Sequence, residues 1–170
     1  MTDAITPSFA PLDIDTLAEA QGRVVVLASE GGSLDKGARR VNRLTRGALE
    51  RDLEGEAFAK QKAGQSTVMA YPSGMAAEAL EVVKVDKRLT PELARKVGAL
   101  VGASLTGQSV TVVAGSHKNL DQLALGAVLR AYEFTARKTG EASEVKDKSL
   151  TIVTGQSEQW AASVDGVMAV

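Results

Sequence analysis

The order of β-branched runs and amphipathic segments is the feature that most constrains this 170-residue chain. Short apolar runs bounded by turn residues predict buried strands over residues 23–29, 66–72, 79–87, 109–115 and 149–155. Helical periodicity predicts helices over residues 33–53, 90–107, 119–139 and 157–170. The alternation, with two adjacent strands in the middle, predicts an α/β fold: a three-layer sandwich with a mixed, largely parallel sheet.

The length fits one domain, and we expect a lead-in before this domain and the start of a linker helix after it. Residues 1–20 contain Pro7 and Pro11 and little periodicity, so we expect a loosely ordered lead-in. The domain itself is expected over residues 21–156. The final helix, from residue 157 to residue 170, has no stop signal, and we interpret it as the start of a linker to a further domain.

The helix predicted over residues 90–107 begins with a good N-cap, Thr90, followed by Pro91 at the first helical position. Ala94, Gly98 and Gly102 form a stripe of small residues at helical spacing. Each glycine costs about 1 kcal/mol relative to alanine inside a helix. We therefore expect this face to lie very close to a sheet or to another helix.

Composition excludes several classes of site. The chain has no cysteine and one histidine, so it holds neither a thiolate metal site nor a histidine-rich one. The net charge of -1 gives no global attraction to nucleic acid. The first residues do not resemble a signal peptide, and no run approaches the roughly 20 apolar residues of a membrane span. We expect a cytoplasmic protein without membrane contact.

Two loops are candidates for binding an anion or a nucleotide. Gly115, Ser116 and His117 lie at the end of one predicted strand, and Thr154 and Gly155 lie at the end of another. The carboxyl ends of parallel strands often form ligand sites, and a following helix N-terminus favours an anion. The plainer interpretation, which we favour, is that both are simple connecting turns. His117 is the only histidine that could activate a serine or threonine, and no known catalytic motif surrounds it.

A basic stripe is the sharpest electrostatic feature of the sequence. Its members recur at helical spacing, which would place them on one face: Lys36, Arg39, Arg40, Arg43 and Arg46. Such a stripe could follow the phosphates of DNA. No aromatic residues interleave with it, and acidic residues follow at once. We therefore favour a solvated face, or ion pairs with a neighbouring subunit or domain.

The segment "LGAVLRAYEFTARKT" resembles the N-terminal domain of the leucyl aminopeptidases, the cytosol aminopeptidase or M17 peptidase family. The family pattern is G-x-x-L-x-x-Y-x-F-x-x-Y-K. The matching positions here are Gly126, Leu129, Tyr132, Phe134 and Lys138, while Ala136 replaces the second tyrosine. The segment "FAKQKAG" is similar to the family's F-x-G-K-x-G, and the order of elements agrees over residues 22 to 165.

The resemblance implies a macro-domain-like fold joined by a linker helix to a C-terminal catalytic domain. In the family that second domain binds two divalent metals, commonly zinc, manganese or magnesium, and removes N-terminal residues from peptides. Its N-T-D-A-E-G-R signature does not occur here. The resemblance therefore implies that this chain carries no catalytic residue and no cofactor. Its expected partners are its own catalytic domain and further copies in a hexamer, so it would serve assembly and active-site access.

Two other functions stay open at this point. The chain could be a binding module for an ADP-ribose-like nucleotide or for DNA, through the loops or the basic stripe. It could also be a small enzyme of its own, although no nucleophile is paired with a base.

Overall fold

Within the part of the chain that the structure describes, the centre is a sheet of six strands in the order β1-β6-β5-β2-β4-β3. The computed structural model describes residues 7–13, 15–31, 34–105, 108–137, 149–155 and 157–168. The strands are β1 Pro7–Ala10, β2 Arg23–Ala28, β3 Ser66–Ala70, β4 Ala79–Lys84, β5 Val110–Gly115 and β6 Leu150–Thr154. Every neighbouring pair is parallel except β3 and β4. The predicted mixed, largely parallel sheet is confirmed.

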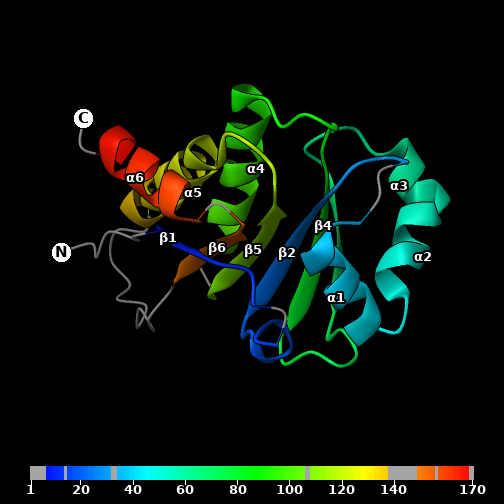
Figure 1. Ribbon diagram of the computed structural model, residues 1–170. Coiled ribbons are helices and arrows are strands. Elements are labelled where there is room, and N and C mark those ends of the chain that lie inside the picture. Colours follow the sequence, from blue (N-terminus) through cyan, green and yellow to red (C-terminus); the bar gives the residue numbers. More distant parts are fainter. Residues whose placement is uncertain are drawn as a thin grey trace.

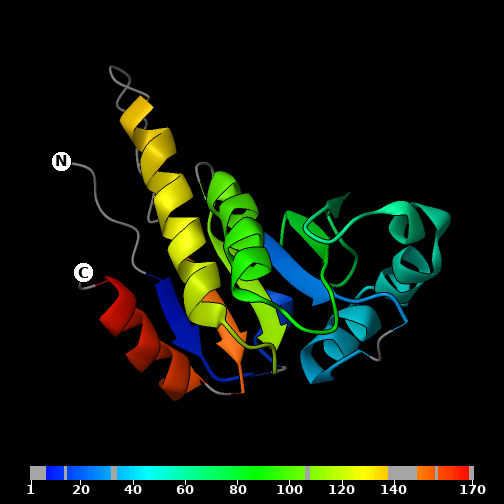
Figure 2. The same ribbon diagram turned by 90° about the horizontal axis from the view of Figure 1, so that it is seen from above.

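Helices cover both faces of the sheet (Figures 1 and 2). They are α1 Lys36–Leu44, α2 Ala48–Glu54, α3 Glu56–Lys60, α4 Pro91–Ser104, α5 Leu120–Arg137 and α6 Ser157–Met168, with a short 3-10 turn η1 Leu17–Glu19. One face carries α4, α5 and α6, and the other carries α1, α2 and α3. This arrangement confirms the three-layer α/β sandwich.

Each face of the sheet has its own apolar core, and β2 contributes to both. Val25 and Leu27 pack in the core beneath α4 and α5. Val24 and Val26 pack in the core beneath α1, α2 and α3. Successive side chains of a strand point to opposite faces, so a strand buried on both sides is apolar at every position. This explains the uninterrupted run "VVVLA" in β2.

The small-residue stripe of α4 packs directly against α5, as the sequence predicts. A Cβ atom added at Gly98 would collide with the carbonyl oxygen of Leu123, and one added at Gly102 would collide with that of Ala127. Gly126 of α5 lies equally close to the carbonyl oxygen of Arg95 in α4. The three glycines therefore allow the two helix backbones to approach each other.

The prediction of one long helix over residues 33–53 is wrong, because the chain divides this range between two helices, α1 and α2. Arg46 and Gly47 adopt positive φ angles of 56° and 83°, which end α1 and start α2 in a new direction. The N-cap is Asp35, whose carboxylate accepts a hydrogen bond from the Ala38 backbone N–H. Ser33, which is also of a residue type that favours the N-cap, lies outside the described residues.

The prediction of a loosely ordered lead-in does not hold for residues 7–10. These residues form the edge strand β1, parallel to β6, with Phe9 opposite Ile152. Proline is tolerated at the start of an edge strand because its missing N–H is not needed there. Leu17 in η1 is also buried in the core. Residues 1–6 lie outside the described residues, and the domain limits at 21 and 156 stay predictions.

Candidate functional site

The two predicted loops lie side by side because β5 and β6 are adjacent and parallel. The Thr154 hydroxyl donates a hydrogen bond of 2.7 Å to the carbonyl oxygen of Gly115. The Gly155 backbone N–H donates to the same oxygen at 3.4 Å. These contacts tie the loops to each other, so the polar groups that could have held a ligand are partly satisfied within the protein.

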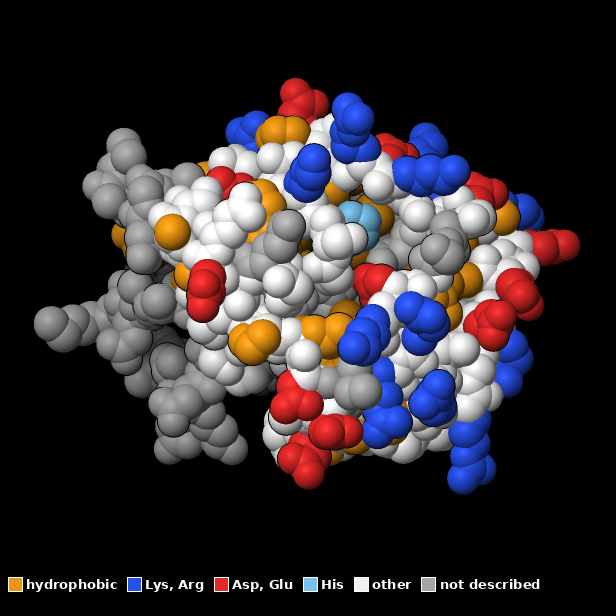
Figure 3. Space-filling model, viewed as in Figure 1, with side chains coloured by type: hydrophobic (Ala, Val, Ile, Leu, Met, Phe, Trp, Pro, Cys, Tyr) orange, Lys and Arg blue, Asp and Glu red, His pale blue; other side chains and the backbone are white. Residues whose placement is uncertain are grey.

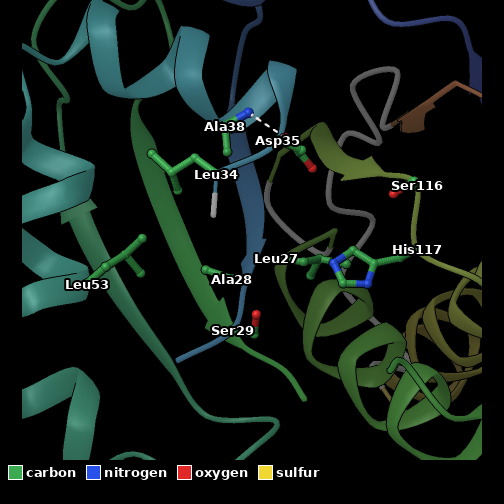
Figure 4. A pocket seen from close by; sticks show the side chains of 9 residues that line it. All are labelled: Leu27, Ala28, Ser29, Leu34, Asp35, Ala38, Leu53, Ser116 and His117. Atoms are coloured by element: carbon green, nitrogen blue, oxygen red, sulfur yellow. Dashed lines mark hydrogen bonds between the residues drawn. The ribbon is translucent and has the colours of Figure 1, made fainter. Parts of the chain in front are cut away.

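A cavity of about 170 Å³ opens at the carboxyl ends of β2 and β5, beside the start of α1 (Figure 4). Its lining combines apolar and polar side chains: Leu27, Ala28, Ser29, Leu34, Asp35, Ala38, Leu53, Ser116 and His117. The predicted residues Ser116 and His117 lie on one side of it, and Asp35 and Leu34 lie across from them. Thr154 and Gly155 are not part of this lining.

Asp35 occupies the place where an anion would bind at the start of α1. One carboxylate oxygen accepts from the Ala38 N–H at 2.8 Å. The other lies against Gly115, where an added Cβ atom would collide with it. Helix N-termini attract anions through unpaired N–H groups and the helix dipole, and here the chain's own carboxylate meets that demand. A second anion in the cavity would be repelled.

His117 brings no positive charge to the cavity at neutral pH. Burial lowers the pKa of its imidazole from the ordinary 6.5, and the Asp35 carboxylate opposes this shift only in part. The cavity therefore combines a fixed carboxylate with a neutral imidazole, which is a poor environment for a phosphate group. Asp35 did not stand out in the sequence, although aspartate is among the preferred N-cap residues.

The basic stripe is partly preserved in the structure. Lys36, Arg39 and Arg43 are exposed on α1, where Figure 3 shows a group of basic side chains. Arg46 is exposed but lies beyond the end of α1, and it adopts the left-handed backbone conformation that ends the helix. Arg40 is half-buried and has an interaction partner. The single helical face of five cations is therefore reduced to three.

Buried charges lie elsewhere and hold the fold together. Lys84, on β4, donates from Nζ to the carbonyl oxygens of Phe58 and Ala59 at 2.9 and 3.3 Å, and to Glu30 at 3.2 Å. Its ammonium also lies 4.9 Å from the centre of the Phe58 ring. These contacts fasten the last turn of α3 to the sheet and involve neither predicted loop.

The described ranges contain no group of three or more histidine, aspartate or glutamate side chains placed to hold a metal ion. Nor do they include a helix that is long and apolar enough to cross a membrane.

Comparison with known families agrees with this fold. The family described as "Cytosol aminopeptidase family, N-terminal domain" matches residues 24–141, more than half of the chain. The molecule is thus a macro-like α/β domain of the kind found at the amino end of these peptidases. The chain belongs to the cytosol aminopeptidase family.

Curated relatives support the same assignment. The chain is 43% identical over 141 residues to a probable cytosol aminopeptidase of Cereibacter sphaeroides. The matched region covers 83% of this chain and 29% of that protein. It is 42% identical over 139 residues to one of Dinoroseobacter shibae, covering 82% of this chain and 28% of that protein. The chain thus spans less than a third of the relatives' length.

Solved structures show the same architecture at low sequence identity. A tomato leucine aminopeptidase mutant superposes with a TM-score of 0.67 at 17% identity, covering 99% of this chain and 37% of that one. A Trypanosoma brucei macrodomain in complex with ADP-ribose superposes with a TM-score of 0.56 at 14% identity, and the match covers 97% of this chain and 78% of that one. An Oceanobacillus iheyensis macrodomain mutant superposes with a TM-score of 0.56 at 14% identity, and the match covers 98% of this chain and 93% of that one. These similarities confirm the macro-like fold.

Proposed function

We propose that this chain is the non-catalytic N-terminal domain of a metal-dependent leucyl aminopeptidase, and that it serves assembly and access to the active site. The observation that carries the proposal is the family match over residues 24–141, combined with curated relatives of which this match covers less than a third. The peptidase chemistry, and the two divalent metals that activate water for it, would belong to the remainder of the longer protein.

Assembly into a hexamer and a cytoplasmic location are parts of the same proposal. The names of the relatives, which are cytosol aminopeptidases, support the location. The hexamer and the role in assembly are carried over from the resemblance of the chain to this family.

A direct assay tests the non-catalytic part of the proposal. The purified chain is incubated with leucine p-nitroanilide, with and without manganese. We expect no hydrolysis above the buffer rate under either condition. Manganese-dependent release of p-nitroaniline by the chain, confirmed after a second purification step, would overturn the proposal.

A domain exchange tests the role in assembly. The matched N-terminal region of the Cereibacter sphaeroides relative is replaced by this chain, and a second version lacks the region altogether. We expect the exchanged protein to keep the oligomeric state and the peptidase activity of the intact relative, and the shortened version to lose the oligomeric state. A shortened version that assembles and works normally would contradict this role.

DNA binding through the basic stripe is the second candidate function. It is favoured by three exposed cations on α1, none of which joins either ion pair seen among the described residues. Duplex binding at low salt, lost in the double variant Arg39→Glu/Arg43→Glu, would support it. Because phosphate contacts release counterions, affinity should also fall steeply with salt. The absence of a gel shift at low salt would remove this candidate.

Binding of an ADP-ribose-like nucleotide has weaker support. The cavity of about 170 Å³ is small beside the roughly 300–1,000 Å³ of typical ligand sites. Asp35 also places a negative charge where a phosphate would lie. Calorimetric titration with ADP-ribose is expected to show no heat of binding, and a clear binding isotherm would reverse this ranking.

A further inference from the structure

The two edges of the sheet are protected to different degrees. At one edge, β1 begins with Pro7, is followed by Pro11, and packs against α6. At the other edge, β3 contains neither a proline nor a charged residue, and β4 is its main neighbour. Figure 2 shows these two strands at opposite ends of the sheet. An edge strand without such protection is a template for pairing with another strand.

The backbone of β3 presents hydrogen-bonding groups on its outer side. Tyr71 continues the ladder to β4, because its N–H donates to the carbonyl oxygen of Glu78 at 2.8 Å. Alternate residues of an antiparallel strand bond to opposite sides. Ser66, Val68 and Ala70 therefore direct their N–H and C=O groups away from β4. Among the described residues, no strand pairs with that side.

The three outward-facing residues have small or β-branched side chains, and no side chain of β3 is charged. Val68, in the middle of the strand, is 49% exposed, and Ala70 is also exposed. Ser66 is half-buried, and its hydroxyl donates to Glu81 at 2.7 Å. Two identical copies of this strand could face each other without repulsion between like charges.

We propose that β3 pairs antiparallel with β3 of a second copy of this chain, about a two-fold axis at Val68. The three outward-facing residues are symmetric about Val68, so one register pairs all of them at once. In that register Val68 lies opposite Val68 of the other copy, and Ser66 lies opposite Ala70. The contact is self-complementary, as a two-fold interface requires. This inference does not depend on the proposed role in an aminopeptidase.

Light scattering after size-exclusion chromatography tests the pairing. The chain is measured from low micromolar to near-millimolar concentration, and we expect a monomer–dimer equilibrium. Val68→Lys should raise the dimer dissociation constant by about tenfold or more, because two like charges would meet at the axis and the apolar contact would be lost. The matched control is Leu129→Lys on α5, which changes an equally exposed apolar residue and should leave the dimer intact.

Hydrogen exchange on the unaltered chain provides a second measurement that needs no variant. As the dimer forms, the amides of Ser66, Val68 and Ala70 should slow, while those of Thr67 and Met69, which face β4, should not change. A chain that stays monomeric up to near-millimolar concentration would overturn the inference. So would a dimer that Leu129→Lys dissociates and Val68→Lys does not, or a dimer that leaves the three outward amides unprotected.

Discussion

Glu81 is a carboxylate buried in the sheet, and two neighbouring side chains satisfy it. Its side chain is 4% exposed and accepts 2.9 Å and 2.7 Å hydrogen bonds from Arg23 and Ser66, which lie on the flanking strands. Removing one partner of such a pair leaves the other charge uncompensated. The network is therefore structural, and it links β2, β4 and β3 across one face.

The first prediction concerns this network. Glu81→Gln should lower the free energy of unfolding by about 2–3 kcal/mol, because the Arg23 guanidinium loses its counter-ion in a largely buried position. Urea denaturation measures the change. Glu78→Gln, an exposed change of the same kind on the same segment, is the control and should stay within about 0.5 kcal/mol of the unaltered chain. Equal effects at the two positions would contradict the argument.

The second prediction concerns His117 and pH. Its pKa in the folded protein lies below the ordinary 6.5, so the unfolded chain binds more protons as the pH falls through 6.5. Stability should therefore decrease from neutral pH down to the lowered pKa. His117→Gln should remove this component, measured as the difference in unfolding free energy between the two proteins at several pH values.

Asp52 titrates with the opposite sign and must be separated from His117. Burial raises the pKa of its carboxyl above 3.8, so the folded state holds its proton more tightly and loses stability as the pH rises through that range. His117→Gln retains Asp52, so subtracting the two profiles cancels its contribution. If the subtracted profile is flat below neutral pH, burial of His117 does not penalise its charged form.

At the scale of the elements, the capping of α1 is the feature that also shapes the cavity. The third prediction compares two changes at Asp35. Asp35→Ala should lower the free energy of unfolding by about 1 kcal/mol, since the Ala38 N–H loses its acceptor. Asp35→Asn keeps an acceptor and should cost only a few tenths of a kcal/mol. Thermal and urea denaturation of both variants measure the difference, and an equal loss in the two would contradict a capping role.

The fourth prediction concerns the contact between α4 and α5. Gly98→Ala should destabilise the protein by about 1–3 kcal/mol, because the added Cβ atom meets the Leu123 carbonyl oxygen and the helices must separate. Helix propensity alone would give the opposite sign, a gain of about 1 kcal/mol. Ala103→Gly, at an exposed position of the same helix, isolates propensity and should cost about 1 kcal/mol. Stabilisation by Gly98→Ala would show that the helix contact is loose.

At the scale of the whole molecule, the two cores meet at the central strands. The fifth prediction is that the amides of β2 and β5 exchange with solvent only on global unfolding, because these strands are covered on both faces. The amides of β1 should exchange faster by local opening, since it is a four-residue edge strand. Native-state hydrogen exchange tests the order. Slower exchange in β1 than in β2 would contradict it.

Much of this architecture could be predicted from local patterns. Five strands and the helices α4, α5 and α6 form close to their predicted limits, because each depends on side-chain period and on a cap or turn residue nearby. The α4 stripe also correctly predicted a close helix contact. The breaks after α1 were missed because the periodicity continues across Arg46 and Gly47 while the backbone turns.

The candidate site was predictable only in part. A strand that ends in a turn predicts a loop at Ser116 and His117, and these residues do follow β5, whose last residue is Gly115. Asp35 was missed because it lies 80 residues away in the sequence and reaches the loop only when α1 packs beside β5. Its position reverses the expected anion preference of the loop. The strand β1 was missed for a related reason, since four residues gain their conformation by pairing with β6.

The sequence by itself thus determined the class of fold, the helix contact at the glycine stripe and the family, since these depend on periodicity, on caps and on short patterns within single segments. Only the tertiary structure decided the order of the strands, the charge that fills the cavity and the edge left open at β3. These depend on which distant segments meet. Contacts across the sheet bring together residues that are separated by tens of positions, and local propensity carries no information about those encounters.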